Sequence, residues 1–409
     1  MPRSLLVITR HTPLPWEDGA GAYLFDVMSA CRNAGFTVHL AWLAPHQPLR
    51  WRGIWTLPKE FSSVVRLHVP GGRRFGRHIV FPIVCGHLIK KKISGLAARL
   101  LSPFILRRKG RPPGSPPPDR GWMSPPSPKE NAFTQELVHR LRPGALIVNY
   151  AWLTPLFPAD RSIQRVCIHS DVAWQRSQLL ASMQSQKPEI DRATEADWLR
   201  QTDVLVAITE NDAREFRLMT PDTRIIVAPK ACTARDLPLT EGSRLLFVGS
   251  DNQFNAEGLD WFLREVWPFI RASAPSVTFD VCGSVCRLIP NAPEGVHLHG
   301  RVNDLQPLYA ASTVVIVPLL RATGLNIKLI DAAANSRPVV TTPATLIGAP
   351  WLTGSVLTAG DAPEFAHTVL RVLGDRELQR TLAASGLRAV RENLSPEKCY
   401  TPLLAALRT

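Results

Sequence analysis

Hydrophobic residues near the start of the chain alternate between strand-like runs and helical spacing. Residues 4–8 form an apolar run, residues 22–31 carry apolar side chains at helical spacing, and residues 36–43 form a second run. Gly19 and Gly21 lie in the predicted loop before the helix, and Gly35 follows the helix as a stop signal. A strand, a glycine loop, a helix and a strand make a βαβ unit. We therefore expect a parallel sheet that begins at residue 4.

The same pattern restarts near residue 244. Apolar runs at residues 244–250, 277–283, 296–302 and 313–318 predict strands, and Asn255 is the predicted N-cap of a helix that continues to about Arg271. The expected fold class is α/β, with two Rossmann-like domains that face a central cleft. We place the first domain at residues 1–235 and the second at residues 236–392. Residues 393–409 form a last helix that could pack back on the first domain.

Length and charge agree with two domains and an anionic partner. The chain has 409 residues, more than one hydrophobic core usually accommodates. It carries 48 basic and 34 acidic residues, a net charge of +14, which suits a phosphorylated substrate, a nucleic acid or an acidic membrane surface. The seven cysteines are scattered and mostly within apolar runs, as expected of free thiols in a reducing compartment. With no apolar run of about 18 residues, we expect a cytoplasmic protein.

The segment at about residues 70–130 interrupts the first domain as a basic, proline-rich insertion. Nine prolines lie between Pro103 and Pro128, so residues 109–129 are expected to be mobile. Before them, apolar residues alternate with a basic set: Lys90, Lys91, Lys92, Arg107 and Arg108. Two interpretations stay open. One is an amphipathic helix on the anionic inner face of the cytoplasmic membrane, and the other is a sheet-covering helix with solvated lysines.

The stretch RATGLNIKLIDAAANSRPVVTTP, residues 321–343, carries the strongest candidate chemistry. It follows a predicted strand with a glycine loop and a short helix. A helix N-terminus at a strand end offers free N–H groups and about half a positive charge to a phosphate. Lys328, Asp331 and Asn335 share one helix face, where a cation and a carboxylate suit phosphate and sugar hydroxyls. The alternative is a surface ion pair between Lys328 and Asp331.

This stretch resembles the donor-binding signature of the family 4-type glycosyltransferases of GT-B fold, also described as glycosyl transferases group 1. The resemblance extends to RLLFVGSDNQFNAEGLDWFLREVWPFI at residues 244–270 and to FDVCGSV, VHLHGRVNDL and LYAASTVVIVPL. Weaker family landmarks are the first glycine loop, VCIHSDV and TDVLVAITENDAREF. The resemblance covers nearly the whole chain outside residues 70–130.

The resemblance implies roles for individual residues. His169, Lys328 and Asp331 would be catalytic, with His169 facing the transferred sugar and Asp331 holding the ribose hydroxyls. Asp171 would contact the acceptor. The residues expected to bind the donor are Gly21, Ser250, Gly300, Arg301, Val302, Thr323, Gly324, Leu325, Lys328 and Asp331.

Two departures from the family pattern matter. Thr323 occupies the position of the signature's first glutamate, and the sequence SDNQFNAEG replaces the arginine and lysine that many members place after the first C-domain strand. Lys230, Arg301 and Arg10 are the alternative cations. Because no Asp-x-Asp run stands at a strand end, we expect no metal and no cofactor besides the nucleotide-sugar substrate.

The expected function is a retaining, metal-independent glycosyltransferase. It would move a sugar from a nucleotide-diphosphate donor to a glycan or lipid-linked acceptor in cell-surface polysaccharide or lipopolysaccharide synthesis. One alternative is a nucleotide-sugar epimerase of the same fold, which needs more active-site acids and histidines. Another is a nucleic-acid- or membrane-binding protein with a degenerate sugar site. Nucleic acid is not the expected partner, because the chain has no aromatic-interleaved basic motif.

Overall fold

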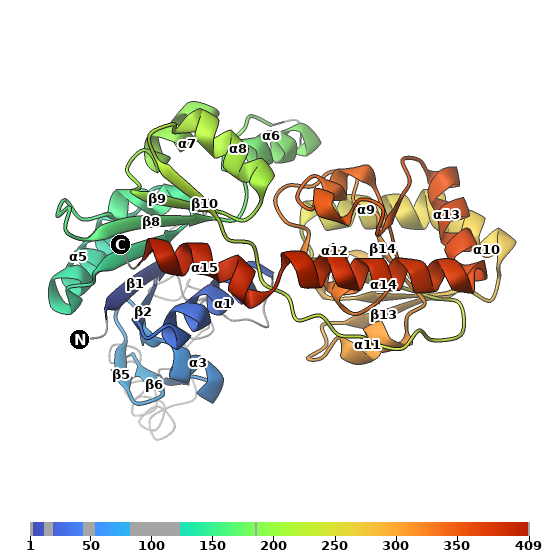
Figure 1. Cartoon of the computed structure of the whole chain (residues 1–409), viewed down its shortest axis with the longest axis horizontal. Helices are drawn as coiled ribbons and strands as arrows, with labels where there is room; N and C mark the ends of the chain where they lie inside the picture. The colour runs from blue at the N-terminus through green and yellow to red at the C-terminus, as the bar shows by residue number, and fades with distance from the viewer. Residues whose placement is uncertain (1–2, 12–18, 44–53, 82–122, 185, 408–409) are drawn as a thin grey trace, which may run out of the picture. The chain divides into compact units, whose positions relative to one another are not determined.

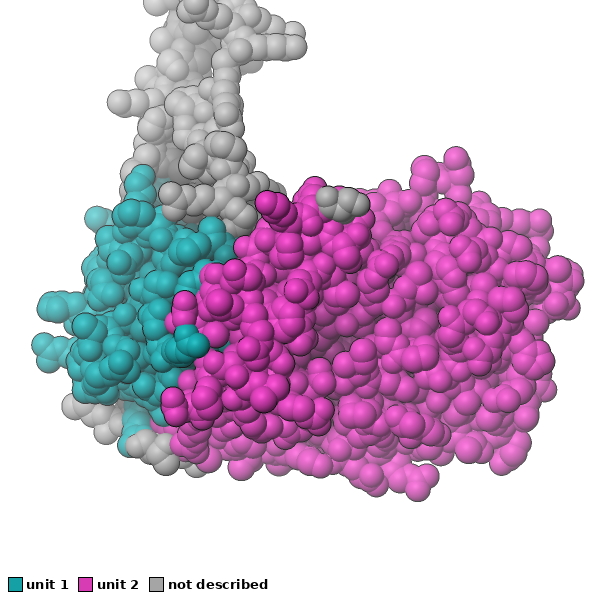
Figure 2. Space-filling view, turned by 90° about the horizontal axis from the view of Figure 1, so that it is seen from above, with its two compact units in different colours: residues 1–168, 198–204 teal, residues 169–197, 205–409 magenta. Residues whose placement is uncertain are grey.

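The structure is a computed structural model that describes residues 3–11, 19–43, 54–81, 123–184 and 186–407 (Figure 1). The basic set at Lys90 to Arg108 and most of the predicted mobile insertion lie outside the described residues. By internal contacts the chain divides into two compact units. Unit 1 contains Met1–Ile168 and Trp198–Val204, and unit 2 contains His169–Asp197 and Leu205–Thr409 (Figure 2). The sequence-based boundary at residues 235/236 stays a prediction.

The first sheet has seven strands, in the order β10-β9-β8-β7-β1-β2-β4. In that order they span Arg224–Val227, Val204–Ala207, Gln164–His169, Ala145–Asn149, Ser4–Thr9, Thr37–Trp42 and Arg66–His68. β1 pairs in parallel with both β2 and β7, so the predicted βαβ start at residue 4 is confirmed. The helices along this part of the chain are α1 (Gly19–Asn33), α3 (Lys59–Val64), η1 (Ala151–Leu156), α5 (Pro128–Leu141), α6 (Ala173–Gln184), α7 (Arg192–Leu199) and α8 (Glu210–Met219).

The second sheet has six parallel strands, in the order β13-β12-β11-β14-β15-β16. They span Val296–Gly300, Thr278–Cys282, Arg244–Val248, Val314–Val317, Val339–Thr341 and Leu357–Thr358. Counted from β11, this order is 3-2-1-4-5-6, the doubly wound Rossmann order. The predicted α/β class is therefore confirmed. Strand order reverses between β11 and β14, the point at which such sheets bind ligands.

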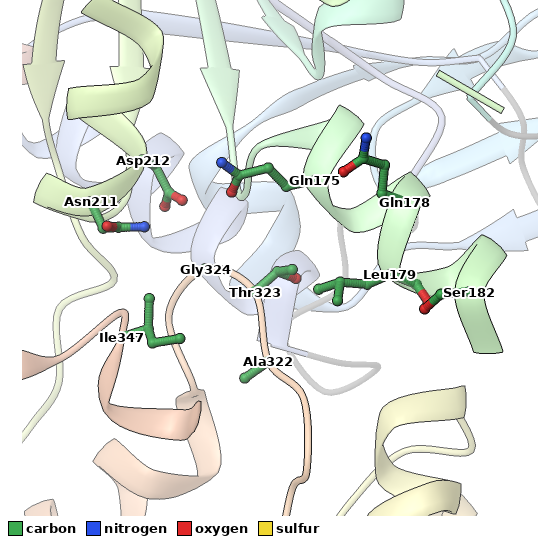
Figure 3. A pocket seen from close by; sticks show the side chains of 10 residues that line it. All are labelled: Gln175, Gln178, Leu179, Ser182, Asn211, Asp212, Ala322, Thr323, Gly324 and Ile347. Carbon is green, nitrogen blue, oxygen red and sulfur yellow. The ribbon is translucent and has the colours of Figure 1, made fainter. Parts of the chain in front are cut away.

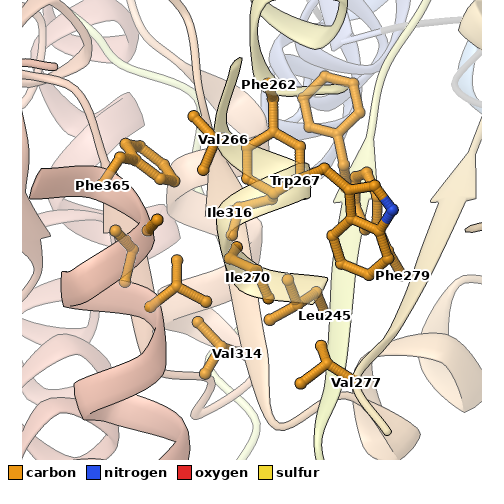
Figure 4. Packing of buried hydrophobic residues seen from close by; sticks show 14 of the residues in the cluster. Leu245, Phe262, Val266, Trp267, Ile270, Val277, Phe279, Val314, Ile316 and Phe365 are labelled. Carbon is orange, nitrogen blue, oxygen red and sulfur yellow. The ribbon is translucent and has the colours of Figure 1, made fainter. Parts of the chain in front are cut away.

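The helices along the second part of the chain are α9 (Gln253–Trp261), η2 (Phe262–Val266), α10 (Trp267–Ser273), η3 (Ser284–Leu288), α11 (Gln306–Ala311), α12 (Ile327–Ala334), η4 (Pro343–Leu346), η5 (Pro350–Leu352), α13 (Ala362–Gly374), α14 (Arg376–Asn393) and α15 (Pro396–Ala406). Three of them, η2, α10 and α13, pack an aromatic cluster against the second sheet. Phe262 lies edge-on to Phe279 at 5.0 Å between ring centroids and to Phe365 at 5.9 Å (Figure 4). These rings join β12, η2 and α13 in one core, which holds the switch-point strands in place.

A stretch without regular secondary structure, residues 228–243, connects β10 to β11. Two arginines bind its backbone: Arg337 and Arg376 donate to the carbonyls of residues 237–240 at 2.7–2.9 Å. Arg337 is 1% exposed and also donates to the Ser312 carbonyl. Side chains of α14 and of the turn after α12 therefore hold this stretch in place. The last helix, α15, contacts β10.

Several local predictions were wrong by a few residues. Asn252, not Asn255, caps the helix at 253, because its side chain accepts from the Asn255 amide at 2.9 Å. The first helix includes Gly21 instead of beginning at Ala22. Helix α5 begins at Pro128, with a capping box between Ser127 and Glu130, so residues 128–129 at the end of the segment expected to be mobile are helical.

A three-stranded antiparallel sheet, β3-β6-β5, was not predicted. Its strands span Ile54–Thr56, His78–Val80 and Arg73–Phe75. Each has three residues, too few for an alternating pattern to be read.

Candidate functional site

The N-terminus of α12 lies at the switch point of the second sheet, directly after β14 and its loop. No side chain caps this helix. Among the described residues, the amides of Gly324, Leu325, Ile327 and Lys328 have no hydrogen-bond acceptor. The neighbouring helix α9, by contrast, is capped by Asn252. Free amides at the start of a helix favour an anion, so this helix end has the properties predicted for a phosphate site.

The loop before α12 is held by close packing. Gly324 has φ +59°, and a Cβ there would lie 2.6 Å from the Ser170 carbonyl oxygen. Gly348 approaches the other side, where a Cβ would meet the Gly324 carbonyl. The Thr323 hydroxyl donates to Asp171 Oδ2 at 3.1 Å. Glycine at position 324 is therefore required by the backbone conformation and by the approach of Ser170.

Lys328 and Asp331 are half-buried on the first turns of α12. Lys328 Nζ lies 3.5 Å from Asn326 Oδ1 and 5.9 Å from the centre of the Phe247 ring. Burial lowers the pKa of Lys328 to about 8, against the opposing effect of Asp331. Burial also raises the pKa of Asp331, although Lys230, Cys232 and Lys328 counteract it. No ion pair closer than 4.0 Å joins Lys328 to Asp331 in the described part of the chain, so both side chains keep capacity for a ligand.

His169 ends β8, as predicted, and its side chain is fully buried. Its Nε2 lies 2.9 Å from Glu195 Oε1, and its ring stacks on Phe216 at 5.6 Å. Glu195 also accepts from the amides of Ala173 and Trp174 at the start of α6. The N-terminus of α6 is thus occupied by a protein carboxylate. Glu195 was not predicted, because it belongs to no recognisable motif.

Two more buried carboxyl groups lie near His169, and their environments differ. Asp171 accepts from Arg176 at 2.9 Å. Burial acts to raise the pKa of Asp171, but Arg176, His169 and Thr323 outweigh it and the pKa is lowered. Asp212 accepts only the Thr209 hydroxyl among the described side chains, at 2.7 Å. Burial raises the pKa of Asp212 to about 7. The charges of Asp171 and Glu195 add to this rise, and the bond from Thr209 opposes it.

A pocket of about 480 Å³ lies beside the α12 loop, within unit 2. Figure 3 shows side chains of α6 on one side, those of α8 on the other, and the loop before α12 with Ile347 below them. The lining residues are Gln175, Gln178, Leu179, Ser182, Asn211, Asp212, Ala322, Thr323, Gly324 and Ile347. The structure therefore brings Thr323 and Gly324 together with residues that the sequence did not single out.

Five further predicted donor-binding residues, outside α12 and its loop, do not line this pocket. Ser250 is exposed after β11, with its hydroxyl near Asn252 and Asn255. Gly300 ends β13, and Arg301 and Val302 follow as exposed residues. Gly21 is buried in α1 of unit 1.

Of the three alternative cations, Arg10 is engaged within unit 1. It forms a two-bond ion pair with Glu130, at 2.8 and 3.0 Å, and also donates to the Ser124 carbonyl. Lys230 donates to the Ala231 carbonyl at 3.4 Å, and its charge opposes the rise in the pKa of Asp331 that burial causes. Lys230 therefore lies near the α12 face, whereas Arg10 serves to hold the start of α5.

The described ranges hold neither a metal-binding cluster nor a membrane-spanning helix. These ranges contain no group of three or more His, Cys, Asp or Glu side chains arranged to hold a metal ion. None of their helices has the length and apolar content required to cross a bilayer.

Comparison with known proteins gives one family match and one curated relative. Residues 242–375 match the family model described as glycosyl transferases group 1. An uncharacterized 44.6 kDa protein in the cps region of Klebsiella pneumoniae is 24% identical over 174 residues. This alignment covers 39% of the present chain and 44% of the relative, so the chain matches less than half of that relative's length.

Solved structures share the fold over nearly the whole chain. Sucrose-phosphate synthase from Thermosynechococcus elongatus has a TM-score of 0.69 at 16% identity, covering 99% of this chain and 98% of that one. A TarM variant from S. aureus, in complex with fondaparinux, α-GlcNAc-glycerol and UDP, has a TM-score of 0.70 at 9% identity and 100% coverage of both chains. Residues 242–375 thus match the glycosyl transferases group 1 family, and the chain shares the GT-B fold of these solved structures.

Proposed function

We propose that this protein is a retaining, metal-independent glycosyltransferase. It takes a sugar from a nucleotide-diphosphate donor and adds it to a glycan or lipid-linked acceptor in cell-surface polysaccharide or lipopolysaccharide synthesis. The observation that carries the proposal is the uncapped N-terminus of α12 at the switch point of the second sheet. The cps-region relative and the UDP complex of TarM support the same interpretation. We place the reaction in the cytoplasm, with no resident cofactor.

The chemistry assigned to α12 is stabilisation of the leaving diphosphate. Breaking the bond between sugar and phosphate creates a positively charged, oxocarbenium-like sugar and a diphosphate that gains negative charge. The amides of Gly324 and Leu325 and the helix end are fixed in place, so they stabilise that charge without reorganisation. Lys328 adds a cation on the first turn of the same helix. Together they perform the charge stabilisation that a divalent metal supplies in other transferases.

Binding of the donor's nucleoside part is assigned to Asp331. In this proposal its carboxylate accepts hydrogen bonds from the ribose hydroxyls, and Lys230 and Lys328 nearby favour its ionised form. Thr323, at the position of the family's missing glutamate, is bonded to Asp171. Asp171 therefore provides a carboxylate beside the loop, where a developing positive charge on the sugar would be stabilised. His169, fully buried, acts on this region through Glu195 and Asp171.

A donor panel tests the proposal. Purified protein is incubated with UDP-, GDP-, dTDP- and ADP-linked sugars, and release of the nucleoside diphosphate is measured with and without glycan acceptors. One donor should be turned over, and Lys328→Met should reduce turnover of it by at least tenfold. Lys187→Met, at an exposed lysine, serves as the matched control. Formation of an epimer of the donor, or salt-sensitive nucleic-acid binding without turnover of any donor, would contradict the proposal.

A further inference from the structure

The pocket beside the α12 loop has an unusual lining for so basic a protein. Although the chain carries a net charge of +14, none of the ten lining residues is lysine or arginine. The polar lining consists of carboxamide and hydroxyl side chains together with one carboxyl group, that of Asp212. An anionic ligand is normally met by a cation. Apart from the Gly324 amide, which is assigned above to the diphosphate, this lining offers no positive group and suits a ligand without charge.

Carboxamides and hydroxyls can both donate and accept hydrogen bonds, as sugar hydroxyls do. Gln175 and Gln178 reach the pocket from α6, and Asn211 reaches it from α8, so such groups face it from two sides (Figure 3). Leu179 and Ile347 add apolar surface, and Ile347 is 55% exposed. A sugar ring presents the same combination of hydroxyl groups and an apolar C–H face. A volume of about 480 Å³ lies within the range of small-molecule sites.

Asp212 fits this neutral lining. Its side chain is 3% exposed, and Oδ2 accepts from the Thr209 hydroxyl. Burial, together with the nearby carboxylates of Asp171 and Glu195, raises the pKa of Asp212 to about 7. The side chain therefore keeps its proton up to about that pH. In that state its carboxyl group can donate as well as accept, like the amides around it.

The pocket shares a wall with the proposed donor site. Thr323 and Gly324 line it and also lead into the N-terminus of α12. The bond from Thr323 to Asp171 and the packing of Gly324 against Ser170 fix that wall. A hydroxyl group held in the pocket would therefore lie next to a donor bound at α12.

We propose that this pocket binds the acceptor as an uncharged, hydroxyl-rich sugar unit, which Gln175, Asn211 and Asp212 select by hydrogen bonds to its hydroxyl groups. This inference rests on the proposed glycosyltransferase function and names its acceptor class. It excludes an acceptor whose phosphate or carboxylate enters the pocket.

The test is binding of methyl glycosides to the full-length protein, measured by ligand-observed NMR. The panel contains neutral methyl glucosides, mannosides, galactosides and N-acetylglucosaminides, together with methyl glucuronide and glycerol phosphate as anionic probes. The wild type should bind a neutral glycoside in preference to both anions. Gln175→Lys places a cation in the pocket, so it should weaken that binding at least tenfold and improve binding of the anions. Gln184→Lys makes the same change on α6 outside the lining and should bind like the wild type.

Three results would overturn the inference: preference of the wild type for an anionic probe, no binding of any neutral glycoside, or equal binding by Gln175→Lys and the wild type. Thermal melting of both variants checks that they are folded. Donor hydrolysis is measured separately, on the wild type and Gln184→Lys. If no nucleotide sugar is hydrolysed, the proposed function fails. The glycoside result still decides whether the pocket prefers neutral sugars.

Discussion

Donor affinity should depend on pH through Lys328. Its pKa of about 8 means that about 90% of the molecules carry the charge at pH 7 and about 10% at pH 9. If the ammonium contacts the diphosphate, affinity should fall roughly tenfold over this interval, or about 1.4 kcal/mol. Burial favours the neutral amine, so Lys328 loses its charge at a lower pH than an ordinary lysine does. Donor affinity should therefore fall as the pH rises.

The assay is calorimetric titration of the preferred nucleotide sugar between pH 6.5 and 9, because its diphosphate has no ionisation in this range. Lys328→Arg keeps its charge throughout and should give a flat profile, although its bulkier head group can alter the affinity itself. Lys187→Arg, at an exposed lysine, should follow the wild type. A flat wild-type profile, together with unchanged affinity in Lys328→Met, would refute the assignment of Lys328 to the diphosphate.

Three further predictions concern other groups. Asp331→Ala should raise the donor KM at least tenfold, whereas Asp304→Ala, at an exposed residue, should leave it unchanged; steady-state kinetics with both variants decides the ribose assignment. Asp212 loses its proton near pH 4 in the unfolded chain and near pH 7 in the folded protein. The free energy of unfolding should therefore decrease by on the order of 4 kcal/mol as the pH rises from about 4 to about 7. Asp212→Asn should remove this decrease. The prediction is contradicted if the free energy of unfolding changes with pH in the same way in the wild type and in Asp212→Asn. Arg337→Met should cost about 3–5 kcal/mol in urea unfolding, because it leaves the buried carbonyls of Ser312 and Asn335 and the part-buried carbonyls of residues 237–238 without this donor. Arg388→Met, at an exposed position, should cost less than about 0.5 kcal/mol.

The parts of the fold that could be predicted are those encoded by local periodicity. The strand ending at His169, the restart of the βα pattern at 244 and the helix that carries Lys328 were all visible as apolar runs with turn signals. The cap of α9 was misplaced because two asparagines lie three residues apart. Both can cap, and only the backbone decides which one does.

Contacts between distant parts of the chain could not be predicted. Thr323 and Asp171 are 152 residues apart in sequence, yet they share a hydrogen bond. Glu195 lies on an ordinary-looking helix, and its pairing with His169 depends on how α7 packs on β8. The pocket lining combines α6, α8 and the loop before α12, a set that no single stretch of sequence reveals. The raised pKa of Asp212 has the same origin, since neighbouring acids and burial produce it.

The hydrogen bonds from Arg337 and Arg376 to the carbonyls of residues 237–240 decide where a stable C-terminal fragment of this protein can begin. Although that stretch has no helix or strand, its main chain is anchored to α14 and to the turn after α12, so proteases should spare it in the native state. A C-terminal fragment that started at β11 would remove the four carbonyl acceptors that these guanidinium groups use in residues 237–240. Expression of the second sheet by itself should therefore start upstream of Arg235.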